Sequence, residues 1–103
     1  MEKPKIVRIT HFGKPVTVSV QTDRFLYGGR LFVQLVVEAD GQDYATVSVN
    51  GGMVSLADNE FVFKTYSENE GLLEGLLAAG VVETTERFVE LGFAGPQPIC
   101  RLL

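Results

Sequence analysis

The stretch from residue 30 to residue 50, RLFVQLVVEADGQDYATVSVN, constrains the fold more than any other part of this chain. It contains two runs rich in aliphatic and β-branched residues, which meet at Asp40-Gly41, a dipeptide typical of β-hairpin turns. A two-residue turn there would mix apolar and polar side chains on both faces. A three-residue loop over residues 39–41 instead gathers the apolar side chains on one face, because it pairs Leu35 with Ala45, Val33 with Val47 and Leu31 with Val49. We therefore expect the second register, with Gly41 in the left-handed conformation that glycine adopts without strain.

Further strands are predicted on both sides of this hairpin. Residues 16–22 alternate strictly between valine and polar residues, as a half-buried antiparallel strand does. The other stretches that we expect to form strands are residues 5–11, 60–66, 82–91 and 99–103.

One helix is predicted over residues 67–80, SENEGLLEGLLAAG. Ser67 and Glu70 have the spacing of a capping box, and Gly80 is placed to end the helix. We expect Gly71 and Gly75, four residues apart, to allow a close approach of helix and sheet. An apolar stripe at helical spacing is expected to pack on the hairpin face described above; its members are Leu72, Leu73, Leu76 and Leu77. The sequence thus predicts an α+β fold, a mostly antiparallel sheet of about six or seven strands with one helix (about 68–79) packed on one face.

The length of 103 residues predicts a single domain, 1–103. No apolar run approaches the length that spans a bilayer, and the start of the chain lacks a secretory apolar segment. We therefore expect a cytoplasmic protein without membrane contact. The single cysteine excludes an internal disulfide and a multi-cysteine metal site.

The net charge of −4 is unevenly distributed. Residues 1–50 hold six Lys/Arg and five Asp/Glu, whereas residues 51–103 hold three and eight. A solvated acidic face explains this distribution, and an acidic surface that meets a basic partner or occupies a nucleic-acid groove of another protein is the alternative. Direct nucleic-acid binding is disfavoured, because no basic stripe is present.

Few residues suggest catalysis. His11 is the only histidine and stands beside a turn, so we expect a histidine at the surface or at the end of a sheet. Cys100 lies in an apolar stretch and is expected to be a buried hydrophobic residue. Asp58 and Glu60 flank Asn59, but the other ligands of a calcium loop are missing. The sequence predicts no cofactor, no metal and no catalytic residue.

The stretch DRFLYGG, residues 23–29, carries three large apolar side chains. We expect Phe25, Leu26 and Tyr27 to pack on the sheet; the alternative is an exposed aromatic loop that binds a partner. The candidate interaction surface combines two of these aromatic residues with acidic residues of the second half of the chain; its members are Phe25, Tyr27, Asp58, Glu60, Glu68 and Glu74.

Several short motifs resemble a domain-of-unknown-function family of small proteins from mobile elements (plasmids, conjugative elements and phages) of Firmicutes-type gut bacteria. In this chain they are GRL at 29–31, QL at 34–35, YATVSVN at 44–50, NEF at 59–61, the leucine helix, GF at 92–93, Pro98 and Arg101. The chain departs from the family at Lys64-Thr65-Tyr66, where the family has an aspartate-asparagine step, and at Gln97, where it favours tyrosine. The resemblance implies a mobile-element setting and brings no activity, cofactor or site residue with it.

These observations favour a non-catalytic protein-interaction module that binds a host or element-encoded factor, for example a component of a defence system. One alternative is a small enzyme or metal-dependent protein that uses His11, Cys100 or a carboxylate pair. Another is a nucleic-acid-associated accessory protein. The identity of the protein partner and the oligomeric state stay open.

Overall fold

The computed structural model describes residues 5–92 and 94–103. Its elements, in chain order, are β1 (Lys5–His11), β2 (Lys14–Arg24), β3 (Leu31–Val37), β4 (Asp43–Thr46), β5 (Ser48–Val49), β6 (Glu60–Phe63), the 3₁₀ turn η1 (Ser67–Asn69), α1 (Leu72–Ala78), β7 (Val82–Glu90) and β8 (Pro96–Leu102).

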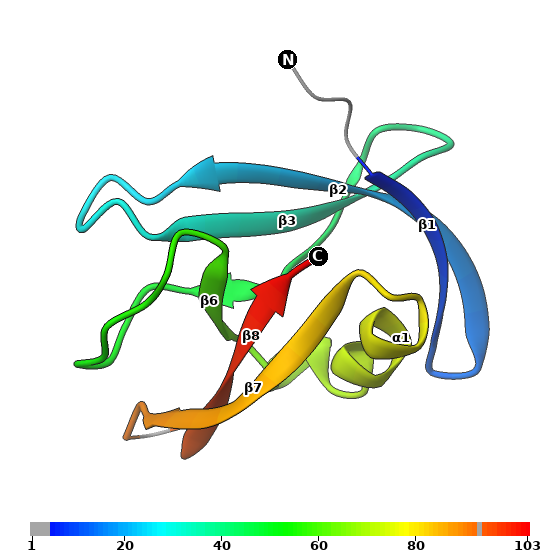
Figure 1. Ribbon diagram of the computed structural model, residues 1–103. Helices are drawn as coiled ribbons and strands as arrows, with labels where there is room; N and C mark the ends of the chain where they lie inside the picture. Colours follow the sequence, from blue (N-terminus) through cyan, green and yellow to red (C-terminus); the bar gives the residue numbers. More distant parts are fainter. Residues whose placement is uncertain (1–4, 93) are drawn as a thin grey trace.

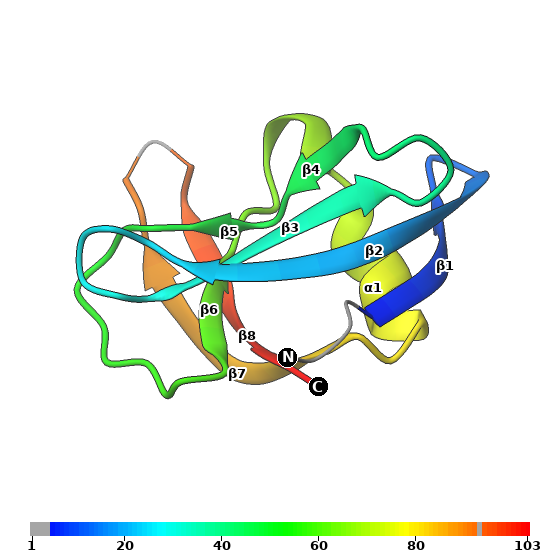
Figure 2. The same cartoon turned by 90° about the horizontal axis from the view of Figure 1, so that it is seen from above.

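The strands form two antiparallel sheets rather than one. The first sheet has the order β1-β2-β3-β4 and the second the order β5-β6-β8-β7. Figure 1 shows the first sheet above the second, with α1 beneath the curved β1–β2 hairpin, and Figure 2 shows β2 passing across β6. The predicted α+β class with antiparallel strands and one helix is confirmed. The expected six or seven strands are eight in the described residues, and they are divided between two layers.

The predicted register of the β3–β4 hairpin is confirmed at its centre. Leu35 pairs with Ala45, and the Val47 amide donates to the Val33 carbonyl over 3.0 Å. The loop itself is one residue longer than expected, because the Val37 amide donates to the Gln42 carbonyl over 2.8 Å. A bulge next to Leu35 absorbs the extra residue, so the apolar side chains still share one face.

The expected pairing of Leu31 with Val49 is wrong, because the chain leaves the first sheet at Val47. The Ser48 side chain accepts the Val33 amide over 2.9 Å in place of a backbone partner. Val49 then pairs with Val62 in the second sheet. A strand that changes sheets at a bend joins the two layers at this corner.

The main core lies between the two sheets and α1. It draws apolar side chains from β1, β2, β3, β4, β6, α1 and β8, among them Ile9, Val18, Leu35, Phe61, Phe63, Leu72, Leu76 and Cys100. A second apolar cluster lies apart from this core. It consists of Val62, Val89 and Ile99, with Val49, Val54, Leu56 and Leu91 packed against them.

The helix is shorter than predicted, and the capping box does not form. Ser67 adopts φ +58° in η1, and the chain turns at Gly71 (φ +79°) before α1 begins at Leu72. Asn69 holds η1 in place, because its buried side-chain amide donates to the Thr46 and Lys64 carbonyls over 2.8 and 3.0 Å. This anchor explains why the helical pattern is interrupted four residues from its predicted start.

The end of α1 agrees better with the sequence. Its buried leucines join the main core, but the strands that it mainly contacts are β1 and β7 rather than the expected β3–β4 hairpin. The Val81 amide donates to the Leu76 carbonyl and the Gly80 amide to the Leu77 carbonyl, which is the Schellman arrangement. The close approach of helix and sheet that was expected at Gly71 and Gly75 is present only at Gly75, where a Cβ would lie 2.8 Å from the Thr10 carbonyl oxygen of β1. A Cβ at Gly71 would meet no atom within 4 Å. Of the leucine stripe, Leu72 and Leu76 are fully buried, whereas Leu77 is 38% exposed.

Replacing Gly41 by valine should lower the free energy of unfolding by about 1–3 kcal/mol, the cost of a forced left-handed conformation. Gly41 has φ +73°, and a Cβ there would meet no atom within 4 Å, so the cost arises from the backbone alone. Chemical denaturation measures it. Gly41→Asn is the matched control, since asparagine tolerates this conformation better. Equal losses for the two variants would contradict this explanation.

Candidate interaction surface

The connection between β2 and β3 exposes two large apolar side chains. The Phe25 amide donates to the Arg30 carbonyl over 2.8 Å and closes the loop. Phe25 is half-buried and meets the Phe32 ring edge to face, with centroids 5.3 Å apart. Leu26 and Tyr27, at the tip, are 97% and 84% exposed. The expectation that all three residues pack on the sheet is therefore wrong for Leu26 and Tyr27, and their exposure fits the alternative of a binding loop.

The connection between β5 and β6 is held by one arginine. The Arg30 guanidinium donates to the carbonyls of Gly51, Gly52 and Val54 over 2.7, 3.1 and 2.8 Å. Met53 lies between the residues that Arg30 holds, and its side chain is fully exposed. Hydrogen bonds from a charged donor are stronger than neutral ones, so the arginine fixes the loop while the methionine side chain stays in solvent.

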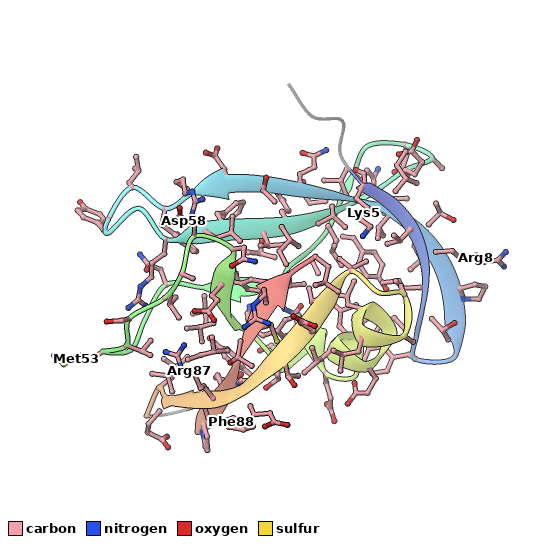
Figure 3. All side chains as sticks on the ribbon, viewed as in Figure 1. Lys5, Arg8, Met53, Asp58, Arg87 and Phe88 are labelled. Atoms are coloured by element: carbon pink, nitrogen blue, oxygen red, sulfur yellow. The ribbon has the colours of Figure 1, made fainter. Side chains whose placement is uncertain are left out.

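The two connections lie at one end of the molecule and are tied together. The Asn50 side-chain amide donates to the Tyr27 carbonyl over 3.0 Å, and the Arg24 guanidinium donates to the Asp58 carbonyl over 3.1 Å. Figure 3 shows Met53 at the extreme tip of this end, with Asp58 near the other connection. We call the exposed side chains of Leu26, Tyr27 and Met53 the loop-end surface.

A shallow pocket of about 410 Å³ adjoins the loop-end surface. Its apolar lining comes from Phe25, Leu26, Tyr27 and Phe32, and its polar lining from Asp23, Arg24 and Asn50. Open, mostly apolar concavities with a few polar groups are typical of binding sites.

The structure brings only part of the predicted surface together. Phe25, Tyr27 and the exposed Asp58 belong to the loop end. Glu74 is exposed on α1, away from it. The side chain of Glu68 lies outside the described part of the structure. Sequence reasoning missed Met53 and the arginine that holds its loop; the available signal was a methionine that directly follows two glycines.

Glu60 is buried and therefore does not belong to an exposed interaction surface. Its carboxylate lies 3.3 Å from an Arg87 nitrogen and 3.7 Å from an Arg101 nitrogen, and it accepts the Ala57 amide over 2.8 Å. Arg101 also pairs with Glu83, and Arg87 donates to the Ser55 carbonyl over 2.7 Å. This network fastens the β5–β6 connection to the second sheet, so the role of Glu60 is structural.

His11 lies at the end of β1, as expected, but it is buried rather than at the surface. Its Nε2 lies 2.9 Å from the Glu70 carbonyl oxygen, which only an N–H can satisfy, and its Nδ1 is hydrogen-bonded to the Tyr44 hydroxyl at 2.7 Å. Burial raises the pKa of the Tyr44 hydroxyl. Both ring nitrogens are thus engaged in holding β1 to β4 and to the segment before α1.

The other titratable residues do not gather into a site. Within residues 5–92 and 94–103, no group of three or more His, Cys, Asp or Glu residues is placed to hold a metal ion. Lys5 reaches toward the Gly80 carbonyl over 3.5 Å, whereas Arg8 points away on the other face of β1 (Figure 3). None of the helices that the described residues form is long and apolar enough to cross a membrane.

Cys100 should react very slowly with a thiol reagent in the native protein. Its side chain is fully buried in β8, and burial raises the pKa of the thiol to about 12. Labelling at pH 8 under native and denaturing conditions measures the difference; native labelling at the rate of the unfolded chain would contradict the burial. The unfolded thiol ionises at about pH 8.5. As the pH rises, the Cys100 thiol therefore loses its proton in the unfolded chain before it does so in the folded protein. This stabilises the unfolded chain, so the free energy of unfolding falls between about pH 8.5 and pH 12.

Comparisons of the chain with protein-family models, curated proteins and solved structures found no match. The resemblance to a mobile-element family stays a prediction from the short motifs quoted above.

Proposed function

We propose that this protein is a non-catalytic interaction module that binds another protein through the loop-end surface. The observation that carries the proposal is the exposure of three large apolar side chains at one end of the molecule, with Leu26, Tyr27 and Met53 all more than four-fifths exposed. Single exposed apolar residues are common on protein surfaces, but a group of them beside an apolar pocket is typical of an interaction site.

The rigidity of the two connections supports the same proposal. Arg30 fixes one loop through three carbonyls, and Asn50 ties it to the other. A surface that is already ordered loses less conformational entropy on binding. Tyrosine and methionine are also enriched in interfaces, where their large side chains adapt to a partner.

The partner that we propose is a host or element-encoded protein. This part of the proposal depends on the mobile-element resemblance. A small protein of a mobile element could act by occupying a surface of a host factor, such as a component of a defence system.

Affinity capture from a lysate of the source cell tests the proposal. We expect the Leu26→Ser/Tyr27→Ser double variant to lose a protein that the unchanged chain captures. Phe88→Ser is the matched control, because Phe88 is also exposed (63%) but lies on β7, outside the two connections that form the loop end. Unfolding curves show whether each variant is folded. Loss of the captured protein with the Phe88 variant alone would place the surface elsewhere, and no change with the double variant would contradict the proposal.

A further inference from the structure

We infer that the pocket beside the loop-end surface receives an arginine side chain of the protein partner. This inference rests on the proposed function and names the chemistry of the partner. An arginine side chain combines an apolar stem with a planar cation, and each part has a matching group in the pocket.

The apolar part of the pocket matches the stem and the flat face of the guanidinium. Phe25 and Phe32 form its aromatic floor, and Tyr27 stands beside them, largely exposed. Guanidinium groups stack on aromatic rings and are more weakly hydrated than the ammonium of lysine. The volume of about 410 Å³ lies at the lower end of the range for ligand pockets and suits a side chain better than a large cofactor.

The carboxylate of Asp23 matches the cation. Asp23 is exposed and stands opposite Phe32 in the β2–β3 register, which places it at the aromatic floor. One of its oxygens accepts the Arg24 amide over 2.8 Å. Within the described residues, the other oxygen has no hydrogen bond and Asp23 has no ion pair. A carboxylate beside aromatic rings, with one oxygen unused, can accept a guanidinium.

The other charges around the pocket leave Asp23 available. Arg24 also lines the pocket, but its guanidinium donates to the Asp58 carbonyl over 3.1 Å instead of pairing with Asp23. Asp58 lies on the neighbouring β5–β6 connection, where its carboxylate is exposed. The chain as a whole carries −4, which attracts a basic partner over longer distances.

Titration of the ¹⁵N-labelled full chain with short peptides tests the inference. The probe is acetyl-Gly-Arg-Leu-Gly-amide, and the matched controls replace its arginine by citrulline, which has nearly the same shape without the charge, or by glutamate. We expect amide shifts at residues 23–27, 32 and 50. The arginine peptide should bind about two- to fivefold more tightly than the citrulline peptide, as for an exposed ion pair, and the difference should shrink in high salt.

Variants assign the effect to the two parts of the pocket. Asp23→Asn keeps an oxygen for the Arg24 amide and should abolish the preference for arginine over citrulline. Tyr27→Ala should weaken both peptides, whereas Phe88→Ala should change neither. Equal binding of arginine and citrulline peptides by the unchanged chain, tighter binding of the glutamate peptide, or shifts outside the pocket would overturn the inference. The absence of binding by all three peptides would also overturn the inference. If capture of a protein from the lysate still depended on Leu26 and Tyr27, the proposed function would stand without it.

Discussion

Replacing Leu76 by alanine should lower the free energy of unfolding by about 2–5 kcal/mol, the usual cost of truncating a buried leucine. Leu76 is fully buried, and it joins α1 to the main core between the two sheets. Alanine would leave a cavity that the close contact of Gly75 with β1 prevents the helix from filling. Urea or guanidinium denaturation measures the loss.

The neighbouring residue provides the control. Leu77 belongs to the same leucine stripe but is 38% exposed, so Leu77→Ala should cost about 1 kcal/mol or less. A loss below about half a kcal/mol for Leu76→Ala would show that this face of the helix is not packed on the sheets. Equal losses at both positions would show that α1 is rotated about its axis relative to the structure.

The features of the fold that the sequence predicted are local or depend on a strict period. The pairing of Leu35 with Ala45 follows from the two-residue alternation of apolar side chains, and a shift by one residue would expose them. The end of the helix at Gly80 follows from hydrogen bonds between residues five or fewer apart. The beginning of the helix could not be predicted in this way, because Asn69 is fixed by the carbonyl of Thr46, 23 residues earlier.

The division into two sheets was missed because it depends on contacts between distant segments. All four residues of β6 are buried, Glu60 included, so this strand has no exposed face that would reveal its position. Val62 is covered by the second cluster, to which the β5–β6 connection contributes Val54 and Leu56. That connection has no regular secondary structure and gave no periodic signal.

The candidate interaction surface was predicted only in part for a similar reason. Apolar residues in a connection are expected to pack on the nearest sheet, and Phe25 does so against Phe32. Whether Leu26 and Tyr27 also pack on the sheet depends on where the loop closes. The hydrogen bond from the Phe25 amide to the Arg30 carbonyl leaves both residues at the tip of the loop. The burial of Glu60 depends on Arg87 and Arg101, which come at least 27 residues later in the chain. Composition alone could not distinguish this carboxylate from the exposed ones.

Replacing Val62 by aspartate should destabilise the protein by about 3–5 kcal/mol, because a charge would be buried without a partner. Val62 is 1% exposed in the second cluster, with Val89 and Ile99 beside it. A single sheet with one covered face, as the sequence suggested, would leave either Val62 or its neighbour Phe61 in solvent. The two-sheet structure buries both, since Phe61 belongs to the main core. The stability of the variant therefore tests whether the β5–β6 connection covers the second sheet.

The matched control is Ile6→Asp, which places the same charge at an apolar strand residue that is 55% exposed. Its expected cost is about 1 kcal/mol or less. If Val62→Asp does not fold, Val62→Ala keeps the test measurable, with an expected loss of about 1–3 kcal/mol from the lost contacts and the cavity. Chemical denaturation of the three variants decides the question. Equal costs for the two aspartate variants would show that Val62 faces solvent. The β5–β6 connection, which carries Met53, would then not pack on the second apolar cluster.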